Sequence, residues 1–202
     1  MASPGELIAT VAAVLGLPES RVFSAHRYLR EAGIVTKGGR GNSAAKMTER
    51  DAVALIVAAV SAHELKESAA AFREWSGLVQ PHDQRAWSGE TCPPLGLLPR
   101  GHCFTDALAT LLSTDSLDFL AGDAATQIRV QLGRPRLLAT IRISPKGGEE
   151  FREYVVDPLP WSRAKTGRGL TAMPPDLQEL YVFTEQTIYA VALCLSGRES
   201  LC

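Results

Sequence analysis

Apolar residues recur at helical spacing near the start of the chain. In residues 6–15, Leu7, Val11 and Val14 follow one another at intervals of three or four positions, which predicts a helix. Gly16 and Pro18 then interrupt the pattern. Glycine suits the end of a helix and proline suits the first turn of the next one, so a second helix is expected over residues 19–32. The pattern therefore predicts two helices joined by a tight turn.

The second predicted helix has one apolar and one polar face. Its inward face consists of Val22, Ala25, Leu29 and His26. Its outward face consists of Ser20, Arg21, Ser24, Arg27, Tyr28 and Glu31. Arginine and serine side chains are suited to contact base edges and phosphates.

A basic, glycine-rich segment follows this helix. Ile34 and Val35 are expected to begin a short strand, and residues 37–42 (Lys-Gly-Gly-Arg-Gly-Asn) are expected to form a flexible turn. Thr48 then begins a third helix, as the N-cap of a capping box with Asp51. The predicted order is helix, turn, helix, wing, helix.

This order resembles the winged helix-turn-helix of the MerR family, in which the helix after the wing often starts Thr-Glu-x-Asp, here residues 48–51. The Leu-Arg-Glu-Ala-Gly-Ile-Val segment, residues 29–35, is similar to the end of the recognition helix in MarR and ArsR proteins. The spacing of Ala12, Gly16 and Val22 is also typical of a helix-turn-helix. The resemblance covers the first third of the chain and implies binding to duplex DNA. The residues expected to contact DNA are Ser20, Arg21, Ser24, Arg27, Tyr28, Lys37, Arg40, Asn42 and Lys46.

The charge distribution agrees with this expectation. The whole chain of 202 residues has a formal net charge of −1. Residues 21–46, however, contain six basic residues and one acid, so the local balance is 6 − 1 = +5. A local basic patch is what a DNA-reading module needs.

In the second half of the chain, apolar and polar residues alternate with the period of two that is typical of strands. Residues 127–132 alternate apolar and polar side chains, and two further strands are expected over residues 137–143 and 151–156. A helix over residues 104–112, a short strand at residues 181–183 and a final helix over residues 184–195 complete an α+β unit. The predicted domains are a winged helix-turn-helix over residues 1–62, a connector helix and linker over 63–100, and an α+β dimerisation, sensor or docking domain over 101–202.

Candidate chemistry in the second half is weaker. Cys103 lies at the start of a predicted helix, where a thiol can be activated, but all four histidines precede it in the chain. His82, Cys92, His102 and Cys103 lack the spacing of a zinc site. We therefore expect a protein that is not an enzyme, with no metal and no cofactor.

The sequence also indicates a compartment and binding partners. The cysteines (Cys92, Cys103, Cys194 and Cys202) show no disulfide framework, and no segment has the features of a signal peptide or a membrane span. We expect a cytoplasmic, homodimeric, double-stranded-DNA-binding protein, most economically a transcriptional regulator, which a phage or mobile element could also encode. The alternatives are a phage DNA-packaging recognition subunit and a protein-interaction adaptor that does not bind DNA.

Overall fold

Helices make up the N-terminal third of the chain, as the hydrophobic pattern predicts. The computed structural model describes residues 2–37, 46–81, 84–90, 92–122, 126–135, 137–144, 149–156 and 179–197. Helix α1 (Pro4–Leu15) begins two residues earlier than expected, because Ser3 and Glu6 form a capping box. Helices α2 (Glu19–Glu31) and α3 (Glu49–Ser61) follow, and the capping box of Thr48 and Asp51 is confirmed. Ile34 and Val35 form no strand. Of the predicted wing, residues 37–42, only Lys37 is among the described residues.

The strands of the second half form an antiparallel sheet. Strands β2 (Gln127–Arg134), β3 (Leu138–Ser144) and β4 (Glu150–Val156) make the predicted meander, and β5 (Glu179–Thr184) pairs with β2. With β1 (Leu78–Val79) the described strands give a five-stranded sheet in the order β1-β4-β3-β2-β5. The predicted α+β class is therefore confirmed.

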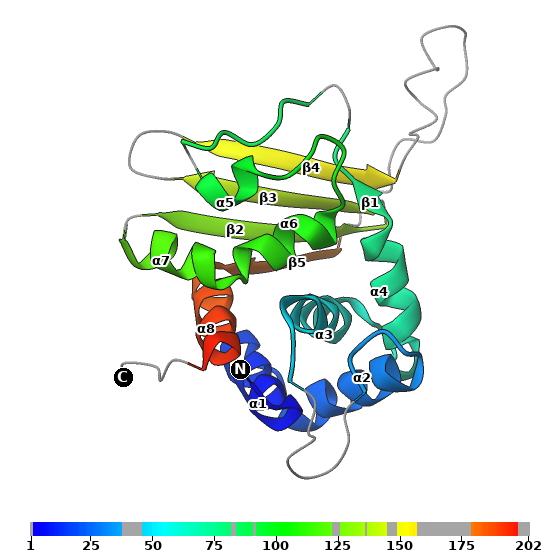
Figure 1. Cartoon of the computed structure of the whole chain (residues 1–202). Coiled ribbons are helices and arrows are strands. Elements are labelled where there is room, and N and C mark those ends of the chain that lie inside the picture. The colour runs from blue at the N-terminus through cyan, green and yellow to red at the C-terminus, as the bar shows by residue number, and fades with distance from the viewer. Residues whose placement is uncertain are drawn as a thin grey trace, which may run out of the picture.

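Helices cover one face of this sheet. Figure 1 shows α5 (Pro93–Gly96), α6 (Phe104–Leu111) and α7 (Thr114–Gly122) lying against it. The last helix, α8 (Glu185–Ser196), extends from the end of β5 and packs against α1. Buried apolar side chains of β2 and β3, such as Val130 and Ile141, face these helices.

Residues 78–101, which the sequence predicts as a linker, are part of the folded unit. After the single-turn η2 (Leu65–Glu67) and α4 (Ser68–Ser76), the chain enters the sheet directly as β1 and pairs with β4. Trp87, Cys92 and Leu95 are buried. Pro93 and Pro94 begin the short helix α5, and the apolar side chains around them still pack into the core.

One contiguous core joins the segments that the sequence assigns to separate domains. The cluster of buried residues includes Leu7 and Leu55 from the N-terminal helices and Phe104, Val130 and Ile188 from the second half. Helix α3 contacts α6, and α1 contacts α8. Within the described ranges, no helix has the length and apolar character that crossing a membrane requires.

Candidate nucleic-acid interface

Helices α1 and α2 meet at a tight turn that fixes their relative direction. Gly16 adopts a left-handed conformation (φ 64°) and ends α1, and the Leu17 amide donates to the Ala12 carbonyl at 3.0 Å. Pro18 is the N-cap of α2, and its carbonyl accepts from the amides of Arg21 and Val22. Only three residues separate the helices.

The two faces of α2 separate cleanly. Val22, Ala25, His26 and Leu29 are buried, as the sequence pattern predicts. Ser20 and Arg27 are exposed on the opposite side, and Ser24 and Tyr28 are half-buried beside them. The Arg27 guanidinium lies 4.8 Å from the centre of the Tyr28 ring and 3.7 Å from the Glu31 carboxylate. Because the Arg27 and Glu31 side chains are 48% and 60% exposed, this ion pair is weak and can be exchanged for another anion.

Arg21 does not share this outward face, contrary to the sequence prediction. Its guanidinium turns toward the C-terminal end of α3 and donates to the carbonyls of Ala59 (3.2 Å) and Ala62 (2.9 Å). The last carbonyls of a helix have no partner within the helix, and a cation at that end is stabilising. The helical wheel places Arg21 at the border of the two faces, and these carbonyls decide its direction. Arg21 is therefore a packing and capping residue.

We expect Arg21→Ala to lower the free energy of unfolding by about 2 kcal/mol, because it removes two charge-assisted hydrogen bonds from a half-buried position. Urea denaturation measures this loss. The matched control is Arg27→Ala, which removes an exposed ion pair on the same helix and is expected to change the stability by less than about 0.5 kcal/mol. Equal losses in the two variants would show that Arg21 does not brace α3.

The ends of the predicted wing are held together by Asp51. This carboxylate is only 4% exposed and accepts from the Thr36 amide (2.8 Å), the Thr36 hydroxyl (2.9 Å) and the Thr48 amide (2.9 Å). It thus clamps the chain leaving α2 to the chain entering α3. Lys37 and Lys46 are both exposed beside this clamp. Arg40 and Asn42, the other predicted wing contacts, lie outside the described residues.

Two exposed side chains of α2 were missed by the sequence reasoning. Phe23 is 57% exposed, and Arg30 is exposed near the end of the helix. Phe23 lies three residues after Ser20 and four before Arg27, so all three share a helical face. This spacing is present in the sequence, but the helical wheel places Phe23 beside the buried His26, at the border of the apolar face. The revised candidate set on α2 consists of Ser20, Phe23, Ser24, Arg27, Tyr28 and Arg30.

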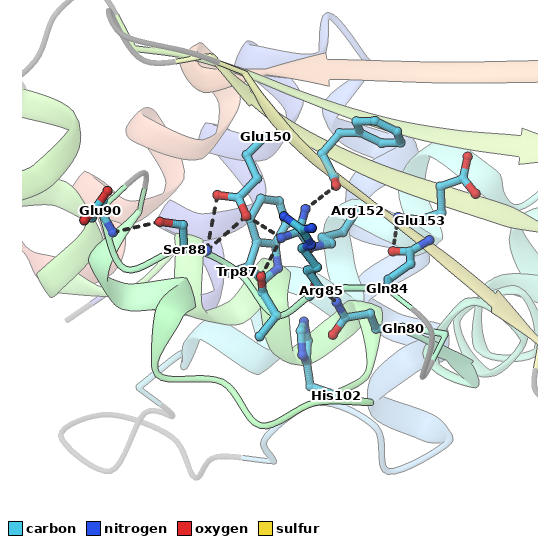
Figure 2. A network of polar contacts seen from close by, with 12 residues as sticks. Gln80, Gln84, Arg85, Trp87, Ser88, Glu90, His102, Glu150, Arg152 and Glu153 are labelled. Carbon is cyan, nitrogen blue, oxygen red and sulfur yellow. Dashed lines mark hydrogen bonds and ion pairs between the residues drawn. The ribbon is translucent and has the colours of Figure 1, made fainter.

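A second polar cluster lies in the other half, beside the edge of β4 (Figure 2). Arg152 donates to the carbonyls of Arg85 (2.6 Å), Ala86 (2.5 Å) and Phe151 (2.6 Å), and pairs with the Glu150 carboxylate. Glu150 also accepts from the Ser88 amide at 3.0 Å. These bonds fasten residues 84–88 along β4 beyond the short pairing with β1, so the cluster has a structural role.

His102 continues this cluster through a chain of hydrogen bonds. The Pro99 carbonyl can only accept, so Nδ1 of His102 donates to it (2.8 Å). Nε2 then accepts from the Tyr154 hydroxyl (2.9 Å), which in turn accepts from Nε1 of Trp87 (3.2 Å). Burial lowers the pKa of His102, which favours the neutral ring. The two hydrogen bonds require that neutral ring, because one nitrogen donates and the other accepts. Both ring nitrogens of His102 therefore have hydrogen-bond partners, and the residue has a structural role.

The cysteines next to this cluster are in environments that disfavour the thiolate. Burial, followed by the nearby Asp106 carboxylate, raises the pKa of Cys103, although Cys103 is the N-cap residue of α6. Burial also raises the pKa of Cys92 to about 11. In the part of the chain that the structure describes, no three His, Cys, Asp or Glu side chains cluster as metal ligands would. His82, one of the four residues that lack zinc-site spacing in the sequence, lies outside that part.

The buried histidines make stability depend on pH. Burial is the main cause that lowers the pKa of both His102 and His26 below the ordinary value of 6.5. The unfolded chain therefore takes up protons at a higher pH than the folded chain does. The stabilising contribution is complete above about pH 6.5 and is lost as the pH falls through the folded-state pKa values. We expect the free energy of unfolding to be lower at pH 5.5 than at pH 7.5.

Urea denaturation at the two pH values measures this effect. In His102→Gln the difference between the two pH values should be smaller than in the wild type, whatever the absolute stability of the variant. An unchanged difference in His102→Gln would contradict the assignment of a buried neutral ring.

No protein-family model matches this chain, and neither the curated proteins nor the solved structures contain a match to it. What the chain does is therefore inferred from its own residues.

Proposed function

We propose that this chain binds double-stranded DNA through α2, which acts as a recognition helix in the major groove. The observation that carries the proposal is the α1–turn–α2 unit, in which a buried face fixes α2 while Ser20, Phe23 and Arg27 remain exposed. The major groove admits a single α-helix, and the second helix of such a unit presents its residues to base edges.

The surroundings of α2 support the same proposal. Lys37 and Lys46 are exposed at the two ends of the segment that Asp51 closes, where they can contact phosphates. Arg30 adds a further exposed positive charge near the end of α2. Glu19 and Glu31 oppose these charges on α2 itself, so the basic residues of the wing are needed for attraction to the DNA backbone.

Within this proposal the chain is a cytoplasmic homodimer that regulates transcription. One recognition helix reads only a few base pairs, so a regulator of this size gains affinity and specificity by presenting two helices to two half-sites. The second half of the chain is the proposed dimerisation or sensing part. Light scattering of the full chain tests the dimer, which a monomeric mass at micromolar concentration would contradict.

Selection of bound duplexes from a random pool by the full chain tests DNA binding. We expect the pool to converge on a site with two related halves. A pool that stays random after repeated rounds would overturn the proposal and favour the protein-interaction adaptor, for which the exposed Phe23 would be the docking residue.

A further inference from the structure

Phe23 is an exposed aromatic residue at the edge of the polar face of α2, one turn before the buried His26. Its neighbours one turn away are Ser20 and Arg27, both exposed. Phe23 is 57% exposed, so much of the apolar surface of its ring remains in water. That exposed surface does not stabilise the core. The exposed part of the ring is therefore available for contact with another molecule.

The position of Phe23 places it where α2 would approach the bases. It is the fifth residue of α2, and the N-terminal residues of a recognition helix are those that contact base edges. Arg27 does not cover it, because its guanidinium is drawn toward Tyr28 and Glu31. The ring is thus free to enter the groove together with Ser20.

The chemistry of the groove then limits what the ring can contact. Bases present hydrogen-bond donors and acceptors in the major groove, and the apolar group among them is the C5-methyl of thymine. A phenyl ring without a hydroxyl has no hydrogen bond to offer. We propose that Phe23 contacts thymine methyl groups, so that the bound duplex carries an A·T pair opposite the N-terminal half of α2. This inference rests on the proposed function and names one base that α2 would contact.

Replacing thymine by deoxyuridine tests this contact, because the change removes the methyl group and keeps the base pair. The thymines of the selected duplex are replaced one at a time, and the affinity of the full chain is measured by fluorescence anisotropy. At one or two positions we expect the wild type to bind about fourfold more weakly, the loss that follows from one buried methyl group. In Phe23→Ala the same replacements should have no effect, and in Phe23→Leu a smaller effect should remain.

The matched control is Leu97→Ala, which removes an apolar side chain that is 87% exposed in the other half of the molecule. It should keep the full sensitivity to deoxyuridine. A duplex without thymine in the contacted region, or equal sensitivity in the wild type and Phe23→Ala, would overturn the inference while leaving DNA binding intact. Failure of the wild type to bind any duplex would overturn the proposed function together with it.

Discussion

Replacing Arg152 by Ala is expected to lower the free energy of unfolding by about 3–5 kcal/mol, the usual cost of breaking a buried ion pair. The Arg152 and Glu150 side chains are only 11% and 13% exposed. Without the guanidinium, the Glu150 carboxylate stays buried with no cation, and the carbonyls of Arg85 and Ala86 lose their donors. Arg152 also lies over the Trp87 ring, at 4.9 Å from its centre, so that packing is lost as well.

Chemical denaturation of the wild type and the variant measures this loss. The control is Arg142→Ala on the neighbouring strand, whose ion pair with Glu149 is about half exposed at both side chains. It should cost less than about 1 kcal/mol. If Arg152→Ala cost no more than Arg142→Ala, the cluster beside β4 would not fasten residues 84–88 to the sheet.

Replacing Asp51 by Ala is expected to cost about 3 kcal/mol. The buried carboxylate is the acceptor for Thr36 and Thr48, and hydrogen bonds to a charged group contribute more than neutral ones. The variant also loses the reciprocal half of the capping box of α3. Since Asp51 closes the base of the predicted wing, the variant should also bind the selected duplex more weakly under conditions in which it remains folded.

Denaturation and DNA titration measure the two effects separately. Glu90→Ala, which removes an exposed loop carboxylate, is the control and should change neither. A loss below about 1 kcal/mol in Asp51→Ala would show that the carboxylate does not hold the two threonines together.

The regular elements could be predicted because their signals are local. Helices α1, α2 and α3 follow from apolar spacing, the capping box from Thr48 and Asp51, and the meander from alternation within single strands. Each of these patterns depends on residues a few positions apart.

Other features could not be predicted because they depend on contacts between distant segments. Residues 78–101 contain prolines and little periodicity, so their pairing with β4 could not be predicted without knowing where β4 lies. The shared core between α1 and α8 likewise joins the two ends of the chain. Arg21 is on the border of the helical wheel, and only the nearby end of α3 decides its direction.

One titration tests directly whether α2 reads DNA. The affinity of the full chain is measured for the selected duplex and for a scrambled duplex of equal composition, with the wild type, Arg27→Ala and Arg129→Ala. Arg129 is an exposed arginine on β2, so its replacement makes the same change in charge away from α2. If α2 reads the bases, Arg27→Ala loses about 1–3 kcal/mol of binding free energy on the selected duplex and less on the scrambled one, while Arg129→Ala binds like the wild type. Equal affinity of all three proteins for both duplexes would contradict this role of α2.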